Sequence, residues 1–428
     1  MDDHVTIGVP IYRGEAFLEE TLRAIQRQTH HNFTAILSVD GPDRACEAIC
    51  GKFLGDTRFQ LHKNGQRAGW VDNINRCMAH VKTGFWCFQQ QDDLIDETYL
   101  ETLLAHADAH PEAALVYCDI ETIGNTDNTI DPVPSVIGDT AFARQMAMLH
   151  EHLVAAAFRG LTKASAVREA GAIPRNDCRD FGVDTAWLAG VARAGELHRV
   201  PQTLYQKRFH GKNTSADWFT RPRAERLETW CAHCVDMVNQ ALGIWCSAPE
   251  SRLLWLAGLE RLTSLNTART FLGLGGLRPD EYAAMLQIFL DRMEASDVHH
   301  LPALLDLPWP GIRKMAEAYF WIPTKLPVEI VDYGPQPVIA GTPFNVQPDG
   351  SSALWVRTNR SIAPGSRYRL RLGGTDLETA VRNRILTACV PAQVTREAVD
   401  LPMQLVTDEG APCSAPVLFR VAPADTEI

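Results

Sequence analysis

The sequence of 428 residues lacks a long hydrophobic run and an excess of positive charge. Its longest apolar stretch, Leu253–Leu259, is far shorter than the roughly 20 residues of a transmembrane helix. Lys and Arg number 41 against 52 Asp and Glu, for a formal charge of −11, so neither nucleic acid nor an anionic membrane is favoured as a partner. The acidic start, Met1 to His4, has none of the features of a secretory signal. We therefore expect no transmembrane segment and a cytoplasmic location.

Cysteine does not form a recognisable disulfide framework. The 11 cysteines are odd in number and scattered along the chain, which is typical of reduced thiols. Cys231 and Cys234 form a CxxC pair around His233, but a structural zinc site needs four ligands, and no second pair follows at a suitable spacing. We interpret these thiols as buried on a helix.

The first 120 residues alternate short apolar strands with amphipathic helices, which predicts an α/β mixed sheet, largely parallel, with helices on both faces. Ligands of such sheets bind beyond the carboxyl ends of the strands. The predicted strands are Val5–Val9, Phe33–Val39, Arg58–His62, Phe85–Phe88 and Ala114–Tyr117. The predicted helices are Glu15–Gln28, Ala45–Phe53, Asp72–Val81 and Thr98–His110.

Composition divides the chain into three predicted domains. Residues 1–217 form the α/β domain, with a polar loop over 124–135, and residues 218–325 form a helical segment. Residues 326–428 contain short β-rich runs separated by Gly, Pro, Asn and Asp, the pattern of a small antiparallel β-sandwich. Its predicted strands are Val328–Val331, Phe344–Val346, Ala353–Val356, Tyr368–Leu372, Ile385–Val390 and Val417–Val421.

Two adjacent carboxylates, Asp92 and Asp93, follow the predicted strand Phe85–Phe88 at the carboxyl edge of the sheet. Oxygen ligands of this kind hold Mg²⁺ or Mn²⁺. A cation here would bridge the phosphates of a nucleotide diphosphate and neutralise the charge of the leaving group. The alternative is structural, because Asp93 could cap the turn that follows. On these residues alone, the metal-site interpretation and the helix-cap interpretation are equally favoured.

Two further carboxylates lie where a substrate could bind. Asp40 follows the strand Phe33–Val39, where a carboxylate can accept the imide N–H of uracil; its alternative role is an Asx-turn. Asp184 opens a predicted helix near Trp187, an aromatic residue able to stack on a sugar ring. A carboxylate there suits the general base that displacement at a sugar carbon requires. The alternative is a carboxylate that stabilises the helix N-terminus.

His210 follows the short predicted strand Thr203–Tyr205 and is flanked by Lys207, Arg208 and Gly211. A lone histidine is more often structural than a ligand. Here the neighbouring cations and glycine favour a corner that binds pyrophosphate and a metal ion, with the imidazole as a ligand.

The order and spacing of these motifs resemble family 2 glycosyltransferases of the GT-A fold, the nucleotide-diphospho-sugar transferase fold. The resemblance covers about residues 4–215. Its motifs are Pro10 and Tyr12 after the first strand, Val39-Asp40-Gly41, Gly69-Trp70-Val71-Asp72-Asn73-Ile74-Asn75, Gln91-Asp92-Asp93, Val183-Asp184 and His210.

This resemblance implies an inverting, metal-dependent hexosyltransferase that moves a sugar from a nucleotide-sugar, in first place a UDP-sugar, to a carbohydrate or glycoconjugate acceptor in the synthesis of a surface polysaccharide. It implies that Mn²⁺ or Mg²⁺ is held by Asp92 and His210 and that Asp184 is the catalytic base. The implied nucleotide-sugar contacts are Pro10, Tyr12 and Asp40 around the base and ribose, Arg67, Gly69 and Asn73 over the nucleotide, and Gln90, Gln91 and Asp92 at the sheet edge.

Two positions depart from the family pattern. Gln90 stands where the family's DxD motif usually begins with Asp, and Val183 stands where the base motif commonly has Glu. Gln90 can still hydrogen-bond ribose or a metal-bound water, but it contributes no charge, which supports an alternative function as a non-catalytic nucleotide-sugar or glycan-binding protein. A nucleotidyltransferase ranks last, because the N-terminal loop has little of the Gly-rich, basic character of that class.

The predicted C-terminal sandwich resembles immunoglobulin-like or IPT-like modules. Such a module could bind glycan, although a role in packing or in homo-oligomer formation is at least as well favoured. An exposed Trp355 would favour glycan binding, and a buried Trp355 would favour a place in the core.

Overall fold

A computed structural model of the chain describes residues 2–82, 84–124, 130, 132–150, 154–210, 218, 220–244, 246–264, 269, 272–274, 277–296, 300–325, 328–348, 350–358, 362, 368–382, 384–407, 410 and 412–424. The chain divides into two compact units. The first comprises Met1–Leu262, Asn266–Gly273 and Ile288–Asp306, and the second comprises Thr263–Leu265, Leu274–Gln287 and Leu307–Ile428. The division into three domains at residues 217 and 325 stays a prediction.

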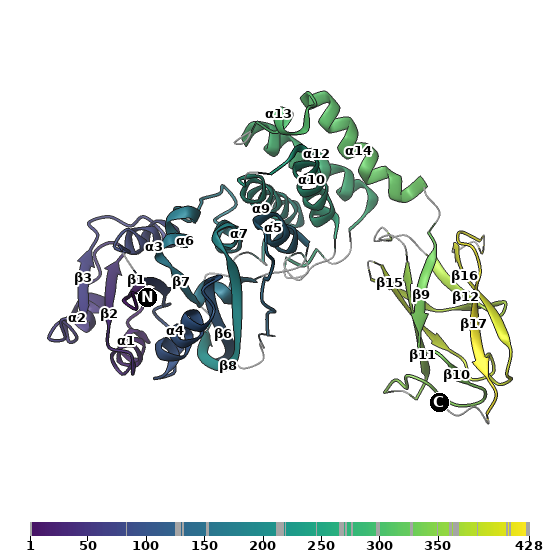
Figure 1. Cartoon of the computed structure of the whole chain (residues 1–428), viewed down its shortest axis with the longest axis horizontal. Coiled ribbons are helices and arrows are strands. Elements are labelled where there is room, and N and C mark those ends of the chain that lie inside the picture. The colour runs from purple at the N-terminus through teal and green to yellow at the C-terminus, as the bar shows by residue number, and fades with distance from the viewer. Residues whose placement is uncertain are drawn as a thin grey trace. The chain divides into compact units, whose positions relative to one another are not determined.

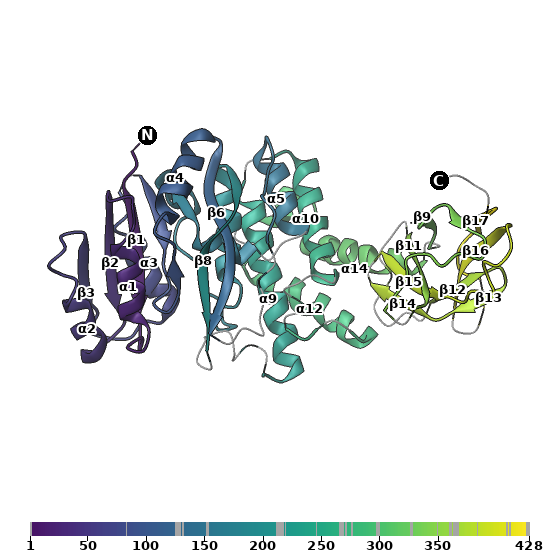
Figure 2. The ribbon, with the colours of Figure 1, turned by 90° about the horizontal axis from the view of Figure 1, so that it is seen from below.

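The first unit is built on an eight-stranded mixed sheet with the order β3-β2-β1-β4-β7-β6-β8-β5. Figures 1 and 2 label β1, β2, β3, β6 and β8 of this sheet. Its strands are β1 Val5–Ile11, β2 Phe33–Val39, β3 Phe59–Lys63, β4 Phe85–Phe88, β5 Leu94–Ile95, β6 Ala113–Gly124, β7 Leu161–Lys163 and β8 Glu196–Phe209. Its helices through residue 242 are α1 Leu18–Gln26, α2 Arg44–Gly51, α3 Trp70–Met78, α4 Tyr99–Ala109, α5 Ala141–His150, the 3₁₀ helix η1 Val154–Arg159, α6 Ala164–Ala170, α7 Val183–Ala194 and α9 Arg223–Leu242.

Helices cover both faces of this sheet because the strands are apolar on both sides. The odd-numbered residues of β1, such as Ile7, belong to a core cluster with side chains of α1, α2 and α4. The even-numbered Gly8 faces the opposite side, where Trp86 of β4 and Cys77 of α3 pack against it. The predicted arrangement of a mixed sheet between helical layers is confirmed.

The direction of the strands determines where their polar ends meet. Strands β1 to β4 run parallel to their neighbours in the order β3-β2-β1-β4. The antiparallel strand β7 lies between β4 and β6, so β6 and its parallel neighbour β8 run in the same direction as β4. The carboxyl ends of β1, β2, β4 and β8 therefore share one edge of the sheet, and their amino ends share the other.

Most predicted element positions agree with the structure. The strands β2 and β4 have the predicted bounds, and α4 differs from its prediction by one residue at each end. The predicted strand Thr203–Tyr205 is only the middle of the much longer β8. Part of the predicted polar loop over 124–135, residues 125–129 and 131, lies outside the described residues.

The predicted helical character of residues 218–325 is also observed. Its further helices are α10 Ala248–Thr263, α12 Pro279–Ser296, α13 Leu301–Leu305 and α14 Trp309–Lys325. All 11 cysteines are free, and Cys231 and Cys234 are buried on α9 as interpreted from the sequence. Among the described residues, no helix combines the length and the apolar character needed to cross a bilayer.

The second unit contains two β-sheets around a shared apolar core. The first sheet has the order β10-β17-β16-β12-β13, and the second has the order β14-β15-β11-β9. The strands are β9 Ile330–Gly334, β10 Val338–Ile339, β11 Ser352–Thr358, β12 Tyr368–Leu372, β13 Thr375–Leu377, β14 Thr379–Arg382, β15 Ile385–Val390, β16 Asp400–Thr407 and β17 Val417–Ala422. The all-β prediction is therefore confirmed, and the likeness to immunoglobulin or IPT modules stays a prediction.

Two details of the β-rich region differ from the sequence-based expectation. Phe344–Val346 is not a strand, and only an isolated bridge joins Val346 to Ser352. Trp355 is half-buried rather than clearly exposed or buried. Its indole lies over Gly334 of the paired strand β9, where an added Cβ would come within 2.7 Å of the ring. Trp355 therefore contributes to the packing of its own sheet.

We predict that Gly8→Ala destabilises the first unit. An added Cβ would overlap the Trp86 indole and lie 2.7 Å from the Cβ of Cys77, and overpacking of this kind costs about 3 kcal/mol. Gly55→Ala is the matched control, because an added Cβ there meets nothing within 4 Å. Urea denaturation of both variants measures the difference, and equal midpoints would contradict the packing described here.

Candidate active site

A short strand pairing brings the predicted metal ligands together. Strand β5 pairs antiparallel with β8, with Leu94 opposite Gln206 and Ile95 opposite Tyr205. The residues before β5 therefore lie beside those that follow Gln206. As a result the Asp92 carboxylate and the His210 imidazole, 118 residues apart in the sequence, are 2.8 Å apart between Oδ2 and Nε2.

The Asp92–His210 pair is accessible to a ligand. The side chains are 18% and 24% exposed, so they are ordered by their surroundings and still reach solvent. The His210 ring also packs against the ring of Phe17, with centroids 5.2 Å apart. The pair is thus held by strand pairing on one side and by an aromatic contact on the other.

Asp93 has a different role from its neighbour. Its carboxylate is buried, accepts hydrogen bonds from the Tyr205 hydroxyl at 2.9 Å and the Arg208 backbone N–H at 2.8 Å, and lies 3.6 Å from the Arg159 Nε. Burial raises the pKa of Asp93, although Arg159 opposes the shift. The alternative of a helix cap is wrong, because the N-cap of α4 is Thr98. Asp93 instead ties the end of β4 to β8.

Two cations complete the charge pattern of the site. The guanidinium of Arg159, at the end of η1, donates from Nη2 to Gln90 Oε1 at 2.7 Å. Burial, followed by the charge of Arg159, lowers the pKa of Lys207 to about 8, against the attraction of Asp93, Asp184 and Asp92. Lys207 therefore lies within electrostatic reach of both Asp92 and Asp184, and it carries a positive charge at pH 7.

The predicted base, Asp184, is the second residue of α7. Its Oδ1 accepts the backbone N–H of Thr185 at 2.8 Å, a position that also fits the structural alternative of a carboxylate at a helix N-terminus. Burial raises the pKa of Asp184, while Arg159 and Lys207 lower it. Trp187 is buried and donates its indole N–H to the Gly171 carbonyl, so the expectation that it stacks on a sugar is wrong.

The predicted nucleotide-binding residues gather at the ends of β1 and β2. The Gln91 side chain accepts the Tyr12 backbone N–H at 2.8 Å and donates to the Tyr12 carbonyl at 3.0 Å. Asp40 accepts the backbone N–H groups of Ala68 and Gly69 at 2.8 and 2.9 Å. Asp40 therefore holds a distant loop, in contrast to the local Asx-turn of its alternative interpretation.

The same loop places Arg67 against Tyr12. The Arg67 guanidinium carbon is 4.1 Å from the centre of the Tyr12 ring, and the half-buried Pro10 precedes Tyr12 at the end of β1. These groups offer a flat aromatic face and a cation at the carboxyl edge of the sheet. The aromatic face is suited to a nucleobase, and the cation is suited to the phosphate groups of the same nucleotide.

Asn73 lies below this surface. It is 1% exposed, accepts the Ser38 hydroxyl at 2.6 Å and donates to the Ser38 carbonyl at 2.9 Å. The structure thus places its amide in the interior between α3 and β2. A direct contact of Asn73 with a nucleotide stays a prediction and would require this amide to leave its present partners.

The donor atoms at Asp92 and His210 fit a divalent cation. A carboxylate oxygen and an imidazole nitrogen 2.8 Å apart can bind one ion, and an oxygen–nitrogen donor set suits Mn²⁺. Within the described residues, the clusters of three or more candidate ligands do not include this pair.

Sequence reasoning missed several residues that shape the site. Arg159 gave no signal, because it lies in an apolar 3₁₀ turn far from the motifs. Tyr205 and Arg208 were noted only as neighbours of His210, yet they bond to Asp93 and to the Asp92 carbonyl. For Tyr205 the strand alternation was the available signal, since Tyr205 and Lys207 share one face of β8.

Comparison with known sequences agrees with this geometry. Residues 6–165 match the model of the family described as Glycosyl transferase family 2. Glycosyltransferase GlyA of Streptococcus pneumoniae is 30% identical over 103 residues, which cover 24% of this chain and 15% of GlyA. An uncharacterized glycosyltransferase of Haemophilus influenzae is 20% identical over 224 residues, 50% of this chain and 67% of that protein. The chain thus spans only a small part of the length of GlyA.

Solved structures show the same fold. The crystal structure of S. aureus TarS aligns with a TM-score of 0.59 and 11% identity over 99% of this chain and 79% of TarS. TarS 1–349 in complex with UDP-GlcNAc aligns with a TM-score of 0.51 and 14% identity over 74% of this chain and 91% of that one. Residues 6–165 therefore match the family 2 glycosyltransferase model, and the chain has a GT-A-like fold like that of these structural neighbours.

Proposed function

We propose that this chain is an inverting, metal-dependent glycosyltransferase that moves a sugar from a UDP-sugar to a carbohydrate acceptor. The observation that carries the proposal is the contact of Asp92 with His210 at 2.8 Å, together with Lys207, which interacts electrostatically with both Asp92 and Asp184. In this proposal these residues supply a metal-ligand pair, a cation and a carboxylate base at the carboxyl edge of the sheet. These are the groups that a displacement at a nucleotide-sugar requires.

The donor would lie across the carboxyl ends of β1, β2 and β4. The nucleobase and ribose would lie at Pro10, Tyr12 and Asp40, with Arg67 beside the ring of Tyr12. UDP is supported as the nucleotide by the structural neighbour whose complex holds UDP-GlcNAc. The diphosphate would then reach Asp92, His210 and Lys207.

In the proposed reaction the acceptor hydroxyl attacks the anomeric carbon from the side opposite to the diphosphate. Its proton passes to the Asp184 carboxylate, and the bond from the anomeric carbon to the phosphate oxygen breaks, so the configuration inverts. Burial raises the pKa of Asp184 and makes it a stronger base than an exposed carboxylate. Lys207 faces the negative charge that the leaving UDP gains. A Mn²⁺ or Mg²⁺ ion, when bound at Asp92 and His210, would supply further neutralisation of this charge.

The proposal also covers the class of acceptor and the cellular role of the enzyme. The S. pneumoniae relative GlyA carries the name of a glycosyltransferase, which fits a role in surface polysaccharide or glycoconjugate synthesis on the cytoplasmic side. The C-terminal β-sheets would then assist by packing, by homo-oligomer formation or by glycan binding. The half-buried Trp355 favours packing among these roles.

A second candidate function is a non-catalytic nucleotide-sugar-binding protein. Gln90 favours it, because its side chain is uncharged and its Oε1 already accepts a hydrogen bond from Arg159. The requirement for Asp184 distinguishes the two functions. A binding protein makes no use of this carboxylate, whereas the proposed enzyme needs it for turnover.

The donor site is tested by Asp92→Ala. We expect the wild-type chain to bind UDP more tightly with Mn²⁺ than without it, and the variant to lose this metal-dependent part, because one of the two protein ligands is removed. Isothermal titration calorimetry with and without Mn²⁺ measures both. Asp108→Ala, an exposed aspartate of α4, is the control. Equal metal dependence in the wild type and Asp92→Ala would refute the metal assignment.

The base is tested by Asp184→Asn. Loss of a general base lowers turnover by about 10²–10⁴-fold, while UDP binding should remain unchanged because Asp184 is assigned to the acceptor side. Initial rates of UDP release from the UDP-sugar that the wild type uses best measure the effect. A variant with normal turnover would place the base elsewhere. A wild-type chain that binds UDP but transfers none of a panel of UDP-sugars would favour the second candidate function.

Lys207→Met should raise stability and weaken UDP binding. The folded protein binds the Lys207 proton less tightly than the unfolded chain does, because burial lowers its pKa from 10.5 to about 8. At pH 7 both states are protonated, so the folded state bears an electrostatic cost on the order of 1–3 kcal/mol. This cost fades as pH rises from 8 towards 10.5, so the stability advantage of the variant should shrink over that window.

The measurement is urea denaturation at pH 7 and pH 10, with UDP calorimetry alongside. Lys52→Met is the control, because Lys52 is 56% exposed in a surface ion pair with Glu19 and should change little. A Lys207→Met variant that is less stable than wild type at pH 7 would contradict the described burial of this cation.

A further inference from the structure

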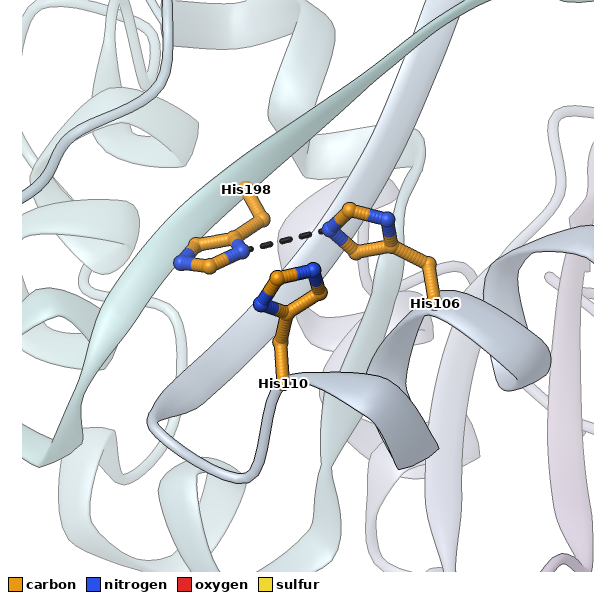
Figure 3. Close-up of side chains that lie close together, drawn as sticks. All are labelled: His106, His110 and His198. Carbon is orange, nitrogen blue, oxygen red and sulfur yellow. Dashed lines mark hydrogen bonds between the residues drawn. The ribbon is translucent and has the colours of Figure 1, made fainter.

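Three histidines meet at the amino-terminal edge of the first unit's sheet, opposite the candidate active site (Figure 3). His106 and His110 lie one turn apart at the carboxyl end of α4, and His198 lies near the start of β8, opposite Val116 of β6. The ring centroids of His106 and His110 are 4.3 Å apart, and they lie 5.4 and 5.0 Å, respectively, from the centroid of His198. One ring nitrogen from each residue lies within 4.8 Å of the others.

Two glutamates orient these rings. The Glu196 carboxylate is 2.7 Å from His198 Nε2, and its other oxygen accepts the Gly138 backbone N–H at 2.9 Å. Glu112 is 3.1 Å from His110 Nδ1. Because an ionised carboxylate only accepts hydrogen bonds, both of these ring nitrogens carry a proton. When these imidazoles are neutral, their lone pairs are on His198 Nδ1 and His110 Nε2.

These lone pairs point into the cluster. His198 Nδ1 is 3.2 Å from His106 Nε2, and Figure 3 shows a ring nitrogen of His110 turned toward the same pair. Two nitrogen ligands of a tetrahedral zinc ion, each about 2.0–2.1 Å from the metal, are separated by about 3.4 Å. The observed spacing is close to this value, and a small movement of His110 would complete a three-histidine face.

We propose that His106, His110 and His198 bind a divalent first-row transition-metal ion, in first place Zn²⁺, at a site separate from Asp92 and His210. Imidazole ligands select this class of ion over Mg²⁺ or Ca²⁺. A carboxylate that accepts the second ring N–H of a ligating histidine is the arrangement that fixes the tautomer and strengthens such ligands. Here Glu196 contacts His198 and Glu112 contacts His110 in this way.

The surroundings favour a cation. Glu112 and Glu196 are negative, and the nearby Lys163 ammonium is engaged with the Pro111 carbonyl at 2.6 Å. This bond holds the turn between His110 and Glu112. His198 is buried and the other two rings are half-buried, which leaves a route from solvent.

The site is distant from the proposed chemistry. His210 lies twelve positions after His198 in the chain, which corresponds to at most roughly 40 Å at 3.3 Å per residue. The ion would join the end of α4 to the start of β8, two segments about 90 residues apart in the chain (His106 and His198 differ by 92 positions). Its expected effect is therefore on stability, with donor binding unchanged.

The test uses the full chain, stripped of metal with a chelator and titrated with Zn²⁺ in a calorimeter. Asp92→Ala serves as the background, which disables the other candidate metal site. We expect one tight equivalent of Zn²⁺ in this background, accompanied by a rise in the melting temperature. His106→Gln and His110→Gln should each lose the tight equivalent and the rise. His80→Gln, an exposed histidine paired with His62, is the control and should keep both.

The same histidine changes, made without Asp92→Ala, should retain the circular dichroism spectrum and the UDP affinity of the wild type, which shows that they fold. Absence of a tight zinc equivalent in the Asp92→Ala chain would overturn the proposal and leave the cluster as a metal-free network of imidazoles and carboxylates. A tight equivalent that survives both His106→Gln and His110→Gln would also overturn it, because another group would then be the ligand.

Discussion

The antiparallel pairing of β5 with β8 is the contact on which the candidate active site depends. It involves only two residue pairs, yet its register decides that Asp93 points to Tyr205 and Arg208 while Asp92 points to His210. A slip by one residue would exchange the two carboxylates between core and surface. The bonds of the buried Asp93 oppose such a slip, because breaking them would leave a charge in the interior. The structural carboxylate thus fixes the position of the proposed metal ligand.

This arrangement concentrates charges in a partly buried region. Asp93 and Arg159 offset one another, while Lys207 and Asp184 each carry a pKa shifted toward the neutral form by burial. Such groups cost stability, and they gather where a charged ligand is to be bound. A nucleotide diphosphate with its metal ion would bring negative charge to Lys207 and positive charge to Asp92. Binding of the proposed ligand would therefore offset part of the cost of holding these charges in a partly buried region.

Much of the fold could be predicted because its signals are local. The strands β2, β4, β12 and β15 were predicted at the observed bounds, since each is a short apolar or alternating run between turn residues. The strand β16 was missed because Pro402 interrupts its pattern, and proline is usually absent from strand interiors. Phe344–Val346 looked like a strand by composition but pairs only through an isolated bridge.

Only those site residues that belong to sequence motifs could be predicted. Asp92 and His210 were found through a pattern of spaced motifs, and the structure brings them into contact. The place of Arg159 in the site and the burial of the Asp93 carboxylate depend on tertiary packing. No local sequence pattern indicates either of them. The three histidines show the same limit, because the i, i+4 pair on α4 is visible but His198 joins it only through the placement of β8.

Strand β8 carries both candidate sites, one at each end, which raises the question of whether they are coupled. Its pairing with β6 is irregular between Cys118 and Ile120, where the register shifts twice. β6 pairs with both halves of β8, but in a different register on each side of the irregular region. In addition, the segment with His198 lies beside α4, and the segment from Tyr205 onward is held by β5 and Asp93. An ion at the histidines would secure the first half without setting the position of His210, so the two sites are expected to act independently.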